Sequence, residues 1–456
     1  MFSHFVKNVL PKCAFTCTYN VWQHTRGRCG PSTNLDQART LLQLIVDRLF
    51  ISPGHTNVEL FKRGTICSYG PLGTELRENV LHQWRRSMTL SRDQVFGINT
   101  PSSGSGGSQD AAGGRRGHLR VVEPGDVRNI LDETELSREQ LVQSVHMFLQ
   151  RSPLFRTNLI QGALEQFVPL FELVNRKLPF GIAETGRCFQ PSEDGSGCPA
   201  EVTQASLVWF CSPRTSSQWL DHWARQRLKW WRKFALAPSD FSSSDVSQDE
   251  LEGAASRGVK IIYKFPWGQE PLEVLWSRGD GELLQMHQGV RSKLQSRDGR
   301  KSIAHIVSIT GNIDRGLLAF LSNSLQVHNR EDAKQKLHQR KVLKLHPLLA
   351  PVKVALGIGR GATMELRQVC EGLWQELKEA KISAWPGYLE TSPMPMEQLN
   401  SKYDEMGVLF TAVISVNTLE SGLLQVRSRD TTIKETMHVS ELNNFLCRYI
   451  SAADNM

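Results

Sequence analysis

The stretch with the clearest potential for chemistry runs from Gly181 to Cys211. It contains two apolar runs, 181–189 and 202–211, of the length and composition typical of short strands. A polar, glycine-containing loop joins these runs and is long enough to reach over a ligand. The pattern therefore predicts a β-hairpin that could cover a bound small molecule.

A second stretch, residues 216–234, interleaves tryptophans with basic residues. A basic helix face backed by indoles suits phosphate contact, with support from stacking or cation–π interactions. The same pattern also fits an ordinary amphipathic helix whose tryptophans are core and whose charges face water, so both interpretations stay open. The candidate DNA-binding residues of this stretch are Arg225, Arg227, Lys229, Arg232 and Lys233.

A third stretch, residues 331–346, is predicted to be a helical, strongly basic connector. No acidic residue follows Asp332 within it to balance the positive charge. A run of charges is usually just a solvated face, yet this one is the second candidate for DNA contact. Its candidate residues are Lys334, Lys336, Arg340, Lys341 and Lys344.

The bulk composition is compatible with a polyanionic partner. The 456 residues carry 54 Lys and Arg against 46 Asp and Glu, a formal net charge of +8. This length predicts two or three domains, and no apolar run approaches the roughly 18 residues that span a membrane. The nine cysteines form no CxxC pair and have no zinc-type histidine spacing. We therefore expect a reducing compartment, no metal, no cofactor and no membrane insertion.

The first 35 residues contain no Asp or Glu, and their basic residues lie among apolar ones. An acid-free, basic and amphipathic start is the signature of a mitochondrial transit peptide. We assign 1–35 to such a peptide and leave it out of the fold, with a merely disordered tail as the alternative.

Two amphipathic patterns predict helices that need a partner surface. In the first, apolar residues recur every four positions from Leu72 to Met88. The second is a pair of helices: 137–151, which opens with Ser137 and Gln140 in capping-box spacing, and 157–177.

We expect the second pair to form an αα-hairpin within an insertion at about 125–180. Two such hairpins would make a four-helix bundle between subunits, and packing within one subunit is the alternative. The candidate dimer-interface residues are Leu72, Leu76, Val80, Trp84, Phe148, Phe167 and Phe171.

Several of these stretches resemble glycyl-type class II aminoacyl-tRNA synthetases. Residues 69–73, Tyr-Gly-Pro-Leu-Gly, are similar to motif 1, whose helix lies at the homodimer interface in that family. The hairpin at 181–211 resembles motif 2, and residues 310–319 resemble motif 3. From Leu345 the chain resembles the anticodon-binding domain of glycyl-, threonyl- and prolyl-type synthetases.

The resemblance implies an α+β and α/β multidomain fold. A class II synthetase-like antiparallel sheet with helices would occupy 36–344, with the helical hairpin inserted in it. An anticodon-binding-like α/β domain would follow at 345–456.

The residues that carry synthetase chemistry are missing from the matching positions. In that family an arginine ending the first motif 2 strand clamps the α-phosphate, and an acid two positions later lies near the adenine; here these are Gln190 and Ser192. A further motif 2 arginine is Ala200, and the acid that helps hold the substrate ammonium is Ser206. A neutral glutamine cannot stabilise charge developing at phosphorus, and Arg315 of motif 3 alone does not assemble the catalytic site. We predict no catalytic residues and no enzyme activity.

A synthetase fold without its chemistry resembles one further family, the accessory subunits of mitochondrial DNA polymerase gamma. Residues 206–210, 218–223, 343–351 and 385–391 are similar to that family. The resemblance implies a homodimer in the mitochondrial matrix and nucleoid that binds duplex DNA without sequence preference. Its C-terminal domain would dock the catalytic subunit and raise processivity in mitochondrial DNA replication. The alternative is a mitochondrial glycyl-type tRNA ligase, or an RNA-binding relic of one.

Overall fold

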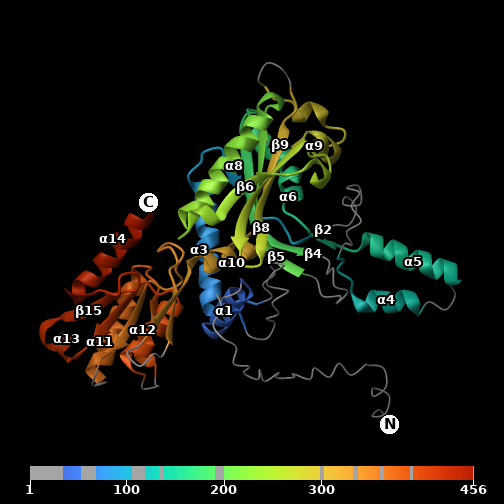
Figure 1. The fold of residues 1–456 in the computed structure, drawn as a ribbon. Helices are drawn as coiled ribbons and strands as arrows, with labels where there is room; N and C mark the ends of the chain where they lie inside the picture. Colours follow the sequence, from blue (N-terminus) through green and yellow to red (C-terminus); the bar gives the residue numbers. More distant parts are fainter. Residues whose placement is uncertain are drawn as a thin grey trace, which may run out of the picture.

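The structure is a computed structural model that describes residues 34–52, 68–104, 119–132, 137–190, 200–297, 302–331, 337–359, 364–390 and 394–454. The predicted transit peptide at 1–35 falls almost entirely outside these ranges, as do Ser192, Lys334 and Lys336. Two sheets dominate the described chain, one on each side of residue 345 (Figure 1).

The larger sheet has seven strands in the order β1-β4-β5-β9-β8-β7-β6. Only β1 and β4 pair in parallel among these described strands, so the sheet is essentially antiparallel. In order of position the strands are β1 (Val95–Gly97), β4 (Phe180–Gln190), β5 (Ala200–Cys211), β9 (His305–Asn312), β8 (Gly268–Gly279), β7 (Arg257–Phe265) and β6 (Phe241–Asp245). The predicted hairpin is confirmed as β4 and β5.

Both faces of this sheet are covered, which explains the unbroken apolar run in β5. Leu207 and Trp209 point into one core cluster, and Val208 and Phe210 point into another. The first face carries α8 (Ser216–Lys233), α10 (Ile313–Ser324) and α3 (Pro71–Arg85), which continues into a π-helical turn, η2 (Arg86–Leu90). The second face carries the short helices α6 (Ile160–Glu165), α7 (Phe167–Leu173) and α9 (Gly281–Met286).

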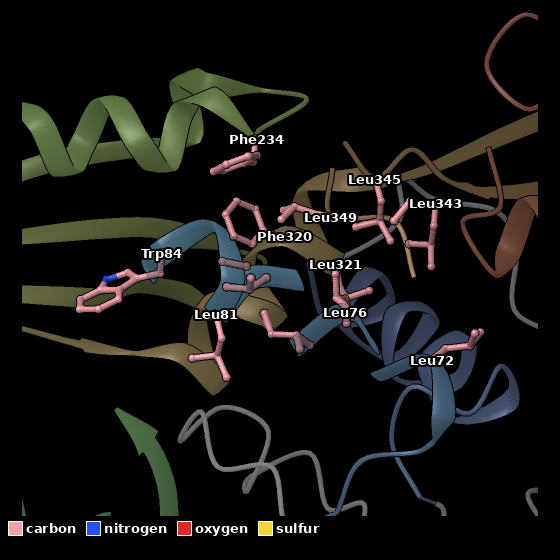
Figure 2. Close-up of a cluster of buried hydrophobic side chains, with 14 of the residues drawn as sticks. Leu72, Leu76, Leu81, Trp84, Phe234, Phe320, Leu321, Leu343, Leu345 and Leu349 are labelled. Atoms are coloured by element: carbon pink, nitrogen blue, oxygen red, sulfur yellow. The ribbon is translucent and has the colours of Figure 1, made fainter. Parts of the chain in front are cut away.

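The apolar stripe of α3 finds its partner surface inside the same chain. The side chains of Leu72, Leu76 and Trp84 are at most 4% exposed. Figure 2 shows them in one cluster with Phe320 and Leu321 of α10 and with three leucines at 343–349. The expectation that this stripe, Val80 included, faces a second subunit is therefore wrong for these side chains.

The insertion differs from its prediction in which helices pair. A helix at 138–151, α5 (Arg138–Arg151), is present with its capping box: the Gln140 N–H donates to Ser137 Oγ at 3.3 Å and the Ser137 N–H to Gln140 Oε1 at 2.9 Å. Its partner, however, is α4 (Pro124–Leu131), and the two helices stand away from both sheets (Figure 1). The short strands β2 (Ser103–Gly104) and β3 (Leu154–Phe155) pair with each other at the base of this insertion.

The predicted helix 157–177 is instead split into α6 and α7 at Gln166. Phe167 and Phe171 stack on each other and on Phe180 of β4, fully buried under the sheet. Their contribution to a dimer interface is thus excluded in this conformation, because these side chains are core residues of one chain.

The basic connector is a β-hairpin and not a helix. Strands β10 (Leu325–Glu331) and β11 (Leu337–Leu343) pair along their whole length, and Val342 and Leu343 are buried. This long-range pairing overrides a helical tendency that was inferred from charged residues alone.

The C-terminal part contains the second sheet, with strand order β13-β12-β14-β15-β16. The parallel strands β13 (Ala384–Trp385), β12 (Val354–Ile358) and β14 (Phe410–Ile414) are followed by the antiparallel β15 (Leu423–Ser428) and β16 (Lys434–His438). The helices here are α11 (Met364–Glu379), α12 (Met396–Glu405), α13 (Val416–Ser421) and α14 (Leu442–Asp454), while α1 (Asn34–Asp47) precedes the large sheet. Arg48, just after α1, ties the two parts together through a 2.6 Å ion pair with Glu405 of α12.

Former synthetase site and candidate nucleic-acid interface

The replaced motif 2 positions lie together on the β4–β5 hairpin. Gln190 ends β4 and pairs with Ala200, the first residue of β5. Ser206 lies farther along β5, directly across from Glu184, and is buried. The two strands that the resemblance to motif 2 implies are therefore present, while these positions offer no positive charge that could clamp a phosphate.

The chain's own side chains occupy the sheet face next to Ser206. Arg156, which follows β3, forms a 2.9 Å ion pair with Glu184, whose side chain is 1% exposed. The Arg156 guanidinium also donates to the Arg187 carbonyl at 2.8 Å and to the Thr100 carbonyl at 2.9 Å. Nothing in the sequence around Arg156 indicated this role, because its partners come from distant segments.

The charged residues that motif 3 retains have structural partners. The buried Asp314 carboxylate accepts the Thr203 backbone N–H at 2.6 Å and the Tyr69 hydroxyl. Burial raises the pKa of Asp314, against the opposing effect of these hydrogen bonds. Arg315 donates to the Pro271 carbonyl at 3.0 Å, and burial lowers its pKa. One residue from each of the three motif-like stretches thus meets at Asp314, which gives these residues a structural role.

The basic residues of α8 divide into buried and exposed groups. Arg227 is 2% exposed, donates to both oxygens of the buried Glu273 at 2.6 and 2.8 Å, and stacks over Trp230. The prediction that Arg227 contacts DNA is therefore corrected: a fully paired, buried guanidinium has no free surface. Arg225 and Lys229 are exposed.

The last two candidates of α8 are already engaged within the chain. Arg232 donates to the Phe241 carbonyl at 2.7 Å, although the residue remains exposed. Lys233 is partly buried and donates to the Asp454 backbone carbonyl at 2.7 Å. The tryptophans 223, 230 and 231 are all buried. On the side that faces the sheet, α8 is therefore an ordinary amphipathic helix whose tryptophans belong to the core.

In the β10–β11 hairpin, Arg340 also has a structural partner. It donates two hydrogen bonds to the Asp404 carboxylate, at 2.6 and 3.1 Å, and Asp404 is 1% exposed. Lys341 and Lys344 are partly buried and keep part of their surface in solvent. The candidate basic surface is therefore smaller than the sequence suggested, and among the described residues Arg225, Lys229 and Arg232 are its exposed members.

An apolar surface that the sequence analysis underestimated lies on α4 and α5. Neither helix buries any residue, and Phe148 is half-exposed. The large apolar side chains exposed here are Leu131 (53%), Val142 (57%), Met147 (52%) and Leu149 (38%). The apolar pattern of these two helices is visible in the sequence. Only the structure shows that their apolar side chains are exposed, whereas those of the α3 stripe are buried.

The described ranges contain neither a membrane-spanning helix nor a cluster of metal-binding side chains. No helix there is long and apolar enough to cross a membrane. No group of three or more metal-binding side chains comes together within the same residues.

Fold and motif geometry define the class of protein: a class II aminoacyl-tRNA synthetase-like chain with a C-terminal anticodon-binding domain. The anticodon binding domain family matches residues 351–448. Glycine--tRNA ligase of Mycolicibacterium paratuberculosis is 25% identical over 83% of this chain and 90% of its own length.

Much stronger similarity joins the chain to a narrower group. DNA polymerase subunit gamma-2 of Mus musculus is 49% identical, over 94% of this chain and 96% of the mouse protein. The Xenopus laevis protein, named DNA polymerase subunit gamma-2, mitochondrial, is 45% identical over 96% of this chain and 92% of its own. The chain belongs to the DNA polymerase subunit gamma-2 family.

Proposed function

We propose that this protein is a non-catalytic accessory subunit of mitochondrial DNA polymerase gamma, which raises the processivity and DNA affinity of the catalytic subunit. The observation that carries the proposal is the retained synthetase hairpin, in which Gln190, Ala200 and Ser206 replace the charged positions. The ion pair between Arg156 and Glu184 lies next to Ser206 and gives this face of the hairpin a structural role. Family membership supplies the polymerase.

The proposed location is the mitochondrial matrix, where the nucleoid lies. The acid-free, basic start of the chain supports import, and the Xenopus relative carries the word mitochondrial in its name.

We propose that two copies associate through the α4–α5 hairpin. Each helix exposes apolar side chains that no part of the described chain covers, such as Val142 and Leu149, seven residues apart on one face of α5. Pairing two hairpins would bury these surfaces in a four-helix bundle. Phe148 stays a candidate for this interface.

Duplex DNA is the proposed polyanion, bound without sequence preference along the exposed side of α8. Arg225 supports this assignment because it is exposed and lies on the same helix as Lys229. An Arg225→Gln variant is expected to weaken binding to unrelated duplexes equally and to reduce the slope of log affinity against log salt by about 1. Arg39→Gln on the distant α1 serves as the control; equal slopes in both variants would remove α8 from the DNA surface.

The catalytic subunit is proposed to dock on the C-terminal domain. Val416, Leu419 and Leu423, at α13 and the start of β15, expose 42 to 45% of their surface close to one another in sequence. Apolar side chains gathered on one exposed edge are typical of interaction sites.

Primer extension tests the proposed function directly. Adding this protein to the catalytic subunit at moderate salt should lengthen the products made in a single binding event. An unrelated protein of similar size and net charge controls for charge alone. Product lengths that do not change with this protein would end the proposal.

A further inference from the structure

A cavity of about 410 Å³ lies beside α8, and Arg225 is not part of its lining. Ser87 and Met88 of η2 form one side, together with Arg92, and buried and exposed side chains of α8 form the other. This volume is within the range of sites that hold small molecules in proteins, roughly 300–1,000 Å³.

The lining of this cavity is strongly cationic. Its charged members are Arg92, Arg227, Lys229, Arg232 and Lys233, with no Asp or Glu among the lining residues of the described chain. Glu273 neutralises Arg227, and Asp454 faces Lys233. Three positive charges, those of Arg92, Lys229 and Arg232, face the cavity, and within the described residues none of them pairs with a carboxylate.

The positive charge is held in a fixed arrangement. The Arg92 guanidinium lies 4.6 Å from the centroid of the Trp223 ring, and its Nε donates to the Ser87 carbonyl at 3.3 Å. Arg232 is fixed by two hydrogen bonds to the Phe241 carbonyl, at 2.7 and 3.0 Å. Preorganised guanidinium groups lose little freedom when they bind an anion, which favours a built site over a loose cationic surface.

The pKa values of His222 and Arg92 are also affected by the positive charges around them. Burial and then the charges of Arg92 and Arg225 lower the pKa of His222. Burial and the charge of Arg227 lower the pKa of Arg92 itself. An anion in the cavity would relieve both effects.

We propose that this cavity is a binding site for phosphate groups. Clustered phosphate carries several negative charges, which matches the three cations of Arg92, Lys229 and Arg232 better than a single carboxylate does. The phosphate could come from a free nucleotide or from a DNA backbone that enters the cavity. The site shares Lys229 with the proposed DNA surface of α8, whereas Arg225 is not part of its lining.

Isothermal titration with inorganic pyrophosphate tests the site on the full-length protein alone. Wild type should bind saturably, and Arg92→Gln and Lys229→Gln should each weaken binding at least tenfold. Arg225→Gln, a charge removed from the same helix outside the cavity, should bind as wild type does. No saturable binding, or an equal loss in Arg225→Gln, would overturn the proposal; thermal midpoints confirm that each variant is folded.

Two further titrations identify the source of the phosphate. Binding of dATP that a short duplex cannot displace would assign the site to a free nucleotide. Displacement of pyrophosphate by the duplex would assign it to the DNA backbone, and either result requires the Arg92 effect seen with pyrophosphate. Because no polymerase is present, failure here is distinct from failure of primer extension.

Discussion

Helices α3 and α5 have similar amphipathic sequences and opposite fates. In α3 the apolar stripe is buried, with Leu76 and Val80 fully covered by the rest of the chain. In α5 no residue is buried, and Val142 exposes more than half of its surface. An apolar stripe on a helix therefore indicates that another apolar surface covers it, but it does not indicate whether that surface belongs to the same chain.

The difference follows from where each helix sits. The helix α3 enters the large sheet's core beside α10 and the segment 343–349 (Figure 2). The α4–α5 hairpin extends away from both sheets (Figure 1), so no described part of the chain buries its residues. The stability of the fold should therefore depend on the apolar stripe of α3, whereas association of two copies should depend on that of α5.

Shortening a buried side chain of α3 should have the largest effect. Leu76→Ala removes a fully buried side chain and should lower the free energy of unfolding by about 2–5 kcal/mol. Chemical denaturation measures this change, with Glu78→Ala on the exposed side of α3 as the control. If both variants lose the same stability, the stripe of α3 is not part of the core.

Charging the exposed face of α5 should change the mass of the particle and leave the fold intact. In Val142→Glu/Leu149→Glu, two carboxylates would be buried without partners if the proposed bundle formed, at a cost of several kcal/mol. Light scattering should therefore give a dimer for wild type and a monomer for this variant, with nearly unchanged circular dichroism. Gln143→Glu, a charge on the same helix, controls for added charge; a dimeric double variant would exclude α5 from the interface.

A smaller effect should appear with pH in the core that α3 shares. His346 packs against Phe234, and burial together with the charges of Lys233 and Lys353 lowers its pKa to about 4, opposed by Asp454. The unfolded histidine, with a pKa near 6.5, binds more protons between these values, so stability should fall as pH drops from about 6.5 to 4. Because the ring keeps part of its surface in solvent, we expect His346 to contribute about 1–2 kcal/mol to that fall, less than the full pKa difference would give.

The pH effect is measured by denaturation of wild type and His346→Asn across that range. The variant should show a shallower loss of stability than wild type, since its side chain does not titrate. Parallel curves would show that His346 is solvated and outside the core.

The elements fixed by local pattern were predictable from sequence. The β4–β5 hairpin and the Ser137 capping box appear close to the expected residues, because alternation and cap spacing are local properties. The positions of Gln190, Ala200 and Ser206 on that hairpin also followed from motif spacing.

The predictions that were wrong concerned segments whose structure depends on contacts with residues distant in the sequence. The segment 157–177 packs under the sheet because Phe167 meets Phe180 and Phe210, and no local feature of its sequence announces those contacts. The segment 337–343 became a strand because 325–331 pairs with it. Arg227 looked like its exposed neighbours, yet Glu273, 46 residues away, holds it in the core.

The central claim is that a synthetase fold persists here without synthetase chemistry, and glycine-dependent ATP–pyrophosphate exchange tests it most directly. Without a cation at Gln190 or Ala200 the protein should give no exchange above the background measured without glycine. Exchange that rises with glycine and saturates would contradict the account and restore the ligase alternative.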